Sequence, residues 1–347
     1  MWYRASRLVD GGGVGGDSAP PIHLSYSPAL SMLFQACSRH LRDGRRCLTV
    51  SSLGLLALFA LIALPRGAAA QRPLKVYISA DLEGIAGVVS GDQLGPTGFE
   101  YGRAREWMTG EVLAAIAAAR ESGATEIVVS DSHGNGESLL IDQLPDDVRI
   151  IRSWPRPLMM MEGIDSTFAA AILIGYHSGT TNPAGVRAHT LSSATLAAVS
   201  LNGVSVPEAG ISAAIAGRYG VPVVLISGDD VAVAEARQLL GDVEGAVVKR
   251  AISFHSASTM PPKAAQQLIR ERVKAALARR TAFKPYIVRA PVQLDVVFKN
   301  YRPAEVLAYL PMVERTTAHS IRFTGRDIVE VSKFLEFINT YEPGIAP

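Results

Sequence analysis

Acidic and histidine side chains follow three short apolar runs of this sequence, at the point where each run ends. The run at 75–80 leads into Asp81-Leu82-Glu83-Gly84, the run at 126–130 into Asp131-Ser132-His133-Gly134, and the run at 170–174 into Gly175-Tyr176-His177. Carboxylate oxygens and imidazole nitrogens without a thiolate suit Zn²⁺, Mn²⁺, Co²⁺ or Fe²⁺. If the three runs are neighbouring strands, the sequence predicts a divalent metal site at their ends.

The whole group supports a metal better than any one residue does. Asp81 and Glu83 are two residues apart, so in an extended chain they point to the same side, where two carboxylates repel each other unless a cation or proton separates them. A lone strand-end aspartate is as readily a helix N-cap, and a lone histidine is more often a hydrogen-bonded residue than a ligand. Asp131 could cap a helix or orient His133. Convergence of the set favours the metal site.

Besides His133 and His177, the chain beyond residue 70 has three histidines, of which one is a candidate for the site and two have no expected role in chemistry. His189 lies in the loop after the third strand end. His255 and His319 lie further along the chain, and we interpret both as structural or surface residues. Asp229 and Asp230 end a strand next to a helix start, where capping is the expected role.

Strands and helices alternate along the chain beyond residue 70. Helices are predicted at 104–122, 208–217, 231–240, 262–280 and 327–341, strands at 75–80, 126–130, 148–151, 170–174, 222–227, 246–249, 294–298 and 320–323, and a hairpin at 195–206 around Asn202-Gly203. Several strands are continuous apolar runs, typical of strands buried on both faces. The predicted fold class is therefore α/β, a mainly parallel sheet flanked by helices with a smaller α+β C-terminal part.

This pattern divides the chain into three regions. Residues 1–70 are expected to be an N-terminal extension and signal peptide, residues 71–250 the metal-binding α/β catalytic domain, and residues 251–347 the smaller α+β part, which the hairpin is expected to join.

A secretory signal accounts for the first region. Arg45 and Arg46 precede an uncharged run rich in Leu and Ala at 47–65, and small residues at 68–70 follow it. That order is typical of a signal peptide, with cleavage expected after Ala70 and export to the periplasm or the exterior. The rival interpretation is an uncleaved membrane anchor, because the apolar run approaches the length that spans a bilayer. General secretion and twin-arginine export both stay open.

The composition is that of a folded globular protein, with 48% hydrophobic and 19% charged residues. Of the 34 basic and 32 acidic residues, seven basic and three acidic ones precede Gln71, so the rest of the chain has no basic excess that would favour nucleic acid. Both cysteines, Cys37 and Cys47, also precede Gln71. The chain from Gln71 onward therefore forms neither disulfides nor thiolate metal sites.

A series of short motifs links the chain to a known enzyme family. The motifs are Asp81-Leu82-Glu83-Gly84-Ile85-x-Gly87, Asp131-Ser132-His133, Met161-Glu162-Gly163, Gly175-Tyr176-His177, Pro207-Glu208-x-Gly210, Gly228-Asp229-Asp230, Val247-Val248-Lys249 and Phe298-x-Asn300-Tyr301. In this order they resemble the zinc D-aminopeptidases encoded with dipeptide-permease genes, and the resemblance extends from about residue 74 to about residue 341.

The resemblance implies a two-zinc site and a role for each residue of that site. It assigns as metal ligands Asp81, Glu83, His133, His177 and Glu208. Asp81 matches the carboxylate that bridges the two metals, and His189 matches a histidine that assists catalysis. Glu208 enters through the resemblance alone, because a carboxylate in the first turn of a helix has an ordinary explanation.

The resemblance also implies an activity and an assembly. The expected function is hydrolysis of short peptides with a free amino end, D-amino-acid-containing ones above all, with two Zn²⁺ per chain and Mn²⁺ or Co²⁺ as alternatives. The family forms a ring-shaped decamer with its active sites inside a channel. The alternatives are an L-specific aminopeptidase or amidase with the same metals, and a secreted peptide-binding protein without activity. A binding protein has no need for five clustered metal ligands.

Overall fold

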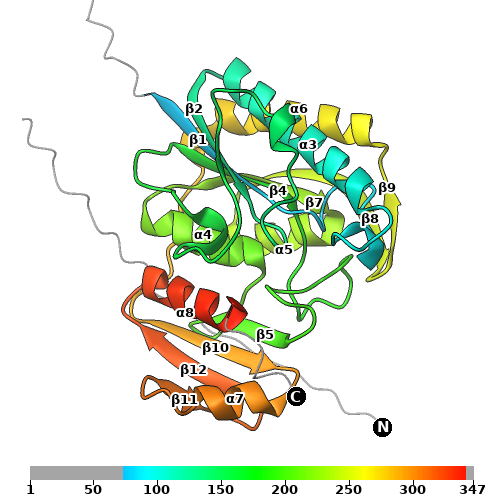
Figure 1. The fold of residues 1–347 in the computed structure, drawn as a ribbon. Helices are drawn as coiled ribbons and strands as arrows, with labels where there is room; N and C mark the ends of the chain where they lie inside the picture. Colours follow the sequence, from blue (N-terminus) through cyan, green and yellow to red (C-terminus); the bar gives the residue numbers. More distant parts are fainter. Residues whose placement is uncertain (1–72, 341–347) are drawn as a thin grey trace, which may run out of the picture. The chain divides into compact units, whose positions relative to one another are not determined.

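The computed structural model describes residues 73–340, which contain two β-sheets (Figure 1). The larger sheet is formed by β1 (Leu74–Ala80), β2 (Ala124–Asp131), β3 (Arg149–Ile151), β4 (Ala170–Tyr176), β7 (Val223–Asp229), β8 (Glu244–Ser253) and β9 (Ser256–Thr259). Its strand order is β3-β2-β1-β4-β7-β8-β9, and all neighbours are parallel except β8 and β9.

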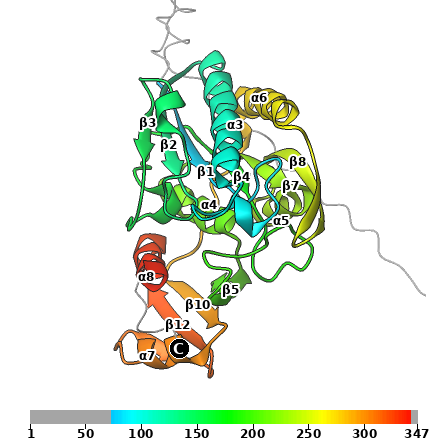
Figure 2. The ribbon, with the colours of Figure 1, turned by 45° about the vertical axis from the view of Figure 1, so that its right-hand side comes forward.

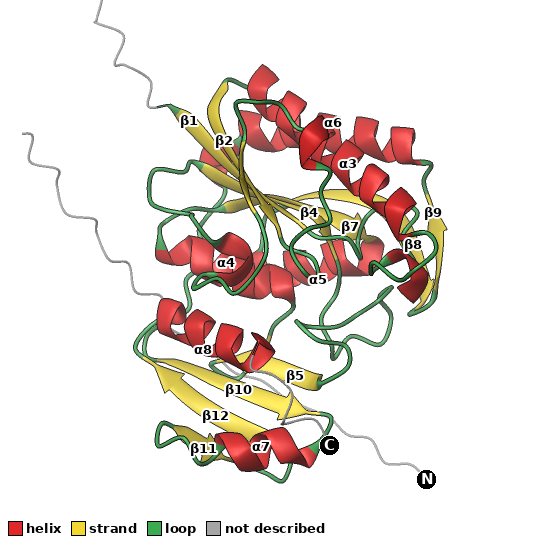
Figure 3. Cartoon of the chain, in the orientation of Figure 1, coloured by secondary structure: helices red, strands yellow, loops and turns green. Residues whose placement is uncertain are grey.

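Helices cover both faces of the larger sheet (Figure 3). One face carries α3 (Tyr101–Glu121) and α6 (Pro262–Ala278), and the other carries α4 (Glu208–Arg218) and α5 (Asp230–Leu240). Every residue of β4 and the last five residues of β2 are buried, as their continuous apolar runs predicted, and β7 is buried throughout as well. The α/β fold class is therefore confirmed.

The smaller sheet is antiparallel and follows the order β11-β12-β10-β5-β6. Its strands are β5 (Leu196–Leu201), β6 (Val204–Ser205), β10 (Val292–Phe298), β11 (Val313–Arg315) and β12 (Ser320–Gly325), and its helices are α7 (Tyr301–Leu307) and α8 (Ile328–Thr340). Helix α8 lies between this sheet and α4 (Figures 1 and 2). The buried side chains of the smaller sheet join those on the α4 side of the larger sheet in one core.

The predicted hairpin is confirmed as β5–β6. Asn202 and Gly203 both have positive φ, 49° and 80°, which is the conformation that a two-residue turn of this kind requires. Gly123, with φ of 92°, follows the end of α3 as predicted. The short elements α7, β9 and β11 were not predicted, and neither were the 3₁₀ turns at Gly91–Gln93, Ile141–Gln143, Met159–Met161 and Arg280–Ala282.

The smaller part begins later in the chain than residue 251. The predicted boundary falls inside β8, and β9 pairs with β8 while α6 packs against α3, so both elements belong to the larger sheet. The predicted joining of the hairpin to the C-terminal part agrees with the pairing of β5 with β10. The predicted signal segment lies outside the described residues. Among residues 73–340, no helix is long and apolar enough to cross a membrane.

Candidate metal centre

The three predicted strand ends lie side by side in the larger sheet. Strand β1 pairs in parallel with β2 on one side and β4 on the other, and Ala80 is level with both Asp131 and Ile174. The residues that follow each strand therefore emerge at one edge of the sheet. Backbone hydrogen bonds continue past the strands, since Asp81 N donates to Ile174 O over 2.8 Å and Ser132 N donates to Ala80 O over 2.8 Å.

Two glycines allow the chain after β1 to fold tightly over the end of β4. Gly84 N donates to Gly175 O over 2.6 Å, and a Cβ on Gly84 would lie 2.2 Å from Tyr176 O. Gly175 has φ of 72°, and a Cβ there would lie 2.2 Å from Asp81 O. This close approach turns the carboxylates of Asp81 and Glu83 toward the strand ends.

A first group of ligands consists of Asp81, Glu83 and His133, all of which are buried. His133 Nδ1 lies 2.7 Å from Glu83 Oε2 and 3.3 Å from Asp81 Oδ1. The other ring nitrogen, Nε2, lies 2.8 Å from Leu94 O, to which it can only donate. In the neutral imidazole, the lone pair of Nδ1 then faces the two carboxylates, as in a metal ligand whose other nitrogen is fixed by a carbonyl.

A second group consists of Asp81, His177 and Glu208, so Asp81 is shared by both groups. His177 Nε2 lies 3.3 Å from Asp81 Oδ2 and 3.4 Å from Glu208 Oε1, and His177 Nδ1 lies 3.0 Å from Ser178 O. Glu208 is the first residue of α4 and also accepts a hydrogen bond from Leu191 N over 2.7 Å. The helix start thus delivers the one carboxylate that the strand ends do not supply.

Two buried atoms at the centre of this site have no hydrogen-bond partner among the described residues. They are Asp81 Oδ2 and His177 Nε2, which face each other. A buried polar atom left without a partner is costly, and a cation between these atoms would satisfy both. The five predicted ligands therefore fit divalent metals, and the arrangement of two groups around a shared Asp81 fits two of them.

The pKa values of these groups are displaced in opposite directions. Burial, and then the charge of Glu83, raises the pKa of Asp81. Burial disfavours ionisation of Glu83, but the imidazole of His133 outweighs it and holds the Glu83 pKa well below its usual range. Burial also opposes the charged form of His177, yet the Glu208 carboxylate raises its pKa well above the ordinary value. Three carboxylates gathered in this way favour positive charge at the site.

His189 lies beside the ligands but farther from the carboxylates. Its ring stacks on that of His177 with centroids 4.1 Å apart and an interplanar angle of 7°. Its Nδ1 lies 2.8 Å from Arg187 O, and its Nε2 is 3.9 Å from Glu83 Oε1 and 3.7 Å from Glu208 Oε1. Glu83, His177 and His189 also form a group that could hold an ion, so the catalytic role of His189 stays a prediction.

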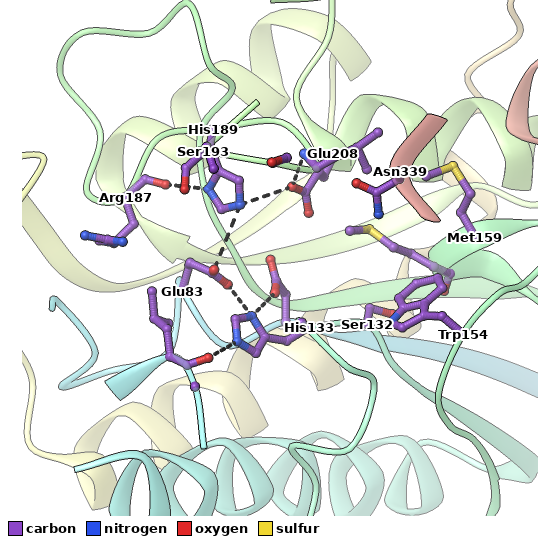
Figure 4. A pocket seen from close by; sticks show the side chains of 18 of the residues that line it. Glu83, Ser132, His133, Trp154, Met159, Arg187, His189, Ser193, Glu208 and Asn339 are labelled. Atoms are coloured by element: carbon purple, nitrogen blue, oxygen red, sulfur yellow. Dashed lines mark hydrogen bonds and ion pairs between the residues drawn. The ribbon is translucent and has the colours of Figure 1, made fainter. Parts of the chain in front are cut away.

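A cavity of about 440 Å³ opens over this centre. Figure 4 shows Glu83, His133, His189 and Glu208 pointing toward one another, while Trp154 and Met159 line another side of the cavity. Helix α8 contributes Asn339 to the lining, which brings the smaller part of the molecule to the site. The cavity therefore has a charged wall and an apolar wall, and is of a size for a short peptide.

Comparison with known proteins agrees with this geometry. The Peptidase_M55 family model, described as D-aminopeptidase, matches residues 74–337. The chain belongs to this D-aminopeptidase family. A D-aminopeptidase of Bacillus subtilis (strain 168) is 34% identical over 258 residues, which cover 74% of this chain and 93% of that protein.

A solved structure extends the similarity to three dimensions. It is described as the Zn-dependent D-aminopeptidase DppA from Bacillus subtilis, a self-compartmentalizing protease, and matches with a TM-score of 0.74 and 32% identity over 76% of this chain and 96% of that one. This member of the D-aminopeptidase family is a metal-dependent hydrolase, as the clustered ligands predicted.

The structure also places the residues for which other roles were expected. Asp229 caps α5 by accepting from Ala232 N over 2.7 Å, and both His255 and His319 are exposed. Asp131 accepts from Leu139 N over 2.7 Å and belongs to none of the three ligand groups. Its carboxylate therefore anchors the loop at Leu139, and the alternative role of orienting His133 stays a prediction.

Sequence reasoning missed the apolar wall of the cavity in this D-aminopeptidase family member. The connection between β3 and β4 supplies Trp154, Met159 and Met160. This connection is not a regular helix or strand, so no hydrophobic periodicity distinguishes a cavity residue from a core residue there. Glu208 also had no signal of its own, since an acidic residue in the first turn of a helix is common. Its burial, at 3% exposure, appears only in the folded chain.

Proposed function

We propose that this protein is an exported two-metal aminopeptidase that cleaves short peptides with a free amino end and a D-amino acid in first position. The observation that carries the proposal is the pair of ligand groups sharing Asp81 at the floor of the cavity. The family and its zinc-dependent relative support zinc as the metal, with Mn²⁺ and Co²⁺ as alternatives suited to the same nitrogen and oxygen ligands.

Each side chain has a defined task in this proposal. Two divalent cations held here would supply Lewis acidity and a hydroxide nucleophile at neutral pH. Asp81 would bind both ions, Glu83 and His133 would complete one site, and His177 and Glu208 the other. His189 Nε2 faces the cavity between Glu83 and Glu208, so a protonated His189 could donate a hydrogen bond to the developing oxyanion or move a proton.

The cavity restricts the substrate in size. At about 440 Å³, it accommodates a short peptide and excludes a folded chain. A free amino end would be held at the charged wall, close to Asp81 and Glu83. An L-specific aminopeptidase or amidase with the same ligands is the second candidate.

A panel of D- and L-aminoacyl dipeptides should separate these candidates. We expect the zinc-loaded protein to hydrolyse dipeptides that begin with a D-residue at least about tenfold faster than their L-counterparts, a difference of about 1.4 kcal/mol. Chelation should abolish hydrolysis and added zinc should restore it. N-acetylated dipeptides serve as the control for the free amino end. Full activity in metal-free protein would overturn the hydrolase mechanism, and preference for L-residues would favour the second candidate.

Export and assembly form the other part of the proposal. The self-compartmentalizing relative supports a homo-oligomer, and the resemblance suggests a decamer enclosing the active sites. Large apolar side chains are well exposed, with Phe99 at 87% and Tyr309 at 82%, which fits contacts between subunits. The residue order around Ala70 supports removal of the N-terminal segment.

Native mass spectrometry of protein recovered from an exporting host should test both points. We expect a chain that begins at Gln71, in an assembly of ten copies, because the small residues at 68–70 provide the cleavage site. Protein produced without export serves as the uncleaved control. A membrane-retained chain that keeps the apolar run at 47–65 would support the anchor instead, and a monomeric mass would contradict the proposed assembly.

A further inference from the structure

Two buried residues with ionisable side chains form hydrogen bonds with the backbone of the loop that carries Asp81 and Glu83, and neither has a role assigned so far. These are Lys249 of β8, at the end of the Val247-Val248-Lys249 motif, and Glu111 of α3. Lys249 is 2% exposed and Glu111 0% exposed. Neither lines the cavity or belongs to a ligand group.

The ammonium group of Lys249 binds only backbone carbonyls of that loop. Its Nζ donates to Glu83 O, Ile85 O and Val88 O over 2.5, 3.1 and 2.5 Å. These contacts use all three of its N–H donors. Three carbonyls of the loop at 83–88 therefore point toward the ammonium group, although residues 83 and 249 are far apart in sequence.

Glu111 holds the same loop through an amide. Its Oε1 accepts from Ala86 N over 2.9 Å, at a position between the carbonyls that bind Lys249. Its Oε2 has no hydrogen-bond partner among the described residues, and the charge of Lys249 acts on it across the loop. The next amide, Gly87 N, donates to Thr259 Oγ1 over 2.7 Å.

Burying an ammonium and a carboxylate is costly, and an apolar pair would pack a core more favourably. These two groups nevertheless lie in the interior and direct their hydrogen bonds to one six-residue segment, 83–88. That segment begins with Glu83, the second carboxylate of the Asp-x-Glu pair, which the proposed function assigns to the site with His133. Asp81 itself is fixed separately, through Asp81 N to Ile174 O and Leu82 N to Asp81 Oδ1.

We propose that Lys249 and Glu111 are positioning residues for the metal site formed by Glu83, His133 and Asp81. They fix the backbone of residues 83–88 so that the Glu83 carboxylate faces His133. The proposal rests on the two-metal function above. It predicts a selective effect, because the other site uses His177 and Glu208, which the loop does not carry.

Lys249→Met should weaken one zinc site and spare the other. Methionine fills a similar volume but donates no hydrogen bond, so the three carbonyls lose their common partner. We expect zinc affinity at one site to fall by about 10–100-fold, the range for residues that orient metal ligands, with about one zinc per chain left after mild chelation. The measurements are zinc content by elemental analysis and chelator competition on the full-length protein, with the melting temperature of the metal-free form as the stability reference.

The controls distinguish positioning from general destabilisation. Ser332→Ala removes a buried hydroxyl of α8 that donates to Pro157 O, and should lower the melting temperature without changing zinc content. Glu111→Leu should repeat the selective zinc loss, whereas Glu111→Gln, which keeps an acceptor for Ala86 N, should not. If Lys249→Met does not fold, the comparison of zinc content between Glu111→Leu and Glu111→Gln tests the proposal instead.

The outcomes separate the inference from the proposed function. A wild-type protein that binds no zinc would overturn the proposed function. Wild-type and Lys249→Met proteins that both hold two zinc ions with equal affinity would overturn the positioning role alone. Equal loss from both sites, in step with a lower melting temperature of the metal-free form, would also overturn it, since it would show a merely structural role.

Discussion

Asp81→Ala is expected to remove both metal ions and nearly all hydrolysis. Asp81 is the one residue common to the two main ligand groups, and its loss leaves two cations without the negative charge between them. The metals are asked to supply several kcal/mol of transition-state stabilisation, so kcat/KM should fall by about 10³–10⁴-fold. Elemental analysis of the purified variant and turnover of a D-aminoacyl dipeptide provide the two measurements.

Asp131→Asn is the matched control for this change. Asp131 is also a buried aspartate at the end of a neighbouring strand, but its carboxylate accepts from Leu139 N and is a member of none of the ligand groups. Asparagine can still accept that hydrogen bond, so zinc content should stay at the wild-type level and activity within about tenfold. Retention of both ions by Asp81→Ala would show that the bridging role is wrong.

His189→Ala is expected to cut turnover without removing metal. His189 Nε2 is 3.7 Å from Glu208 and 3.9 Å from Glu83, farther from the carboxylates than the corresponding atoms of His133 and His177, and its predicted role is that of a helper group. Loss of an oxyanion donor or proton shuttle typically lowers kcat by about 10²–10³-fold, or about 3–4 kcal/mol. Zinc content and kcat should be measured on the same preparation.

The alternative for His189 has a different signature. Because Glu83, His177 and His189 could together hold an ion, a variant that loses half its zinc along with activity would make His189 a ligand. His255→Ala, at an exposed position away from the cavity, provides the control for histidine removal. Unchanged kcat and zinc in His189→Ala would reduce His189 to an ordinary loop residue.

Local sequence patterns predicted the strands of the larger sheet except β9, and the residues at three of its strand ends. A short β-type run indicated β1 and continuous apolar runs indicated β2 and β4, and the residues after them supplied Asp81, Glu83, His133 and His177. These predictions succeed because burial on both faces of a parallel strand constrains consecutive residues, and because parallel strands bring their ends to one edge. Asn202-Gly203 succeeded for a similar reason, since a two-residue turn is a local requirement.

Contacts between remote segments decided the rest of the site. Glu208 was predicted as a ligand only through the family resemblance, and the approach of α4 brings its carboxylate within 3.4 Å of His177 Nε2. The predicted boundary at residue 250 differs from the structure because the sequence of β9 and α6 does not show which elements they contact. In the folded chain β9 pairs with β8 and α6 packs against α3. A helical or strand period shows which face of an element is buried, but not against which element it lies.

Lys249 shows most clearly the difference between what the local sequence predicts and what the tertiary structure decides. From the sequence it is one charged residue at the end of a short apolar strand, which is ordinarily a solvated position. In the folded chain it is 2% exposed and donates a hydrogen bond to the backbone of Glu83, a candidate ligand 166 residues away. Sequence alone thus determined which residue types reach the sheet edge. The tertiary structure decided which of them meet, because hydrogen bonds between distant segments depend on packing that no local pattern records.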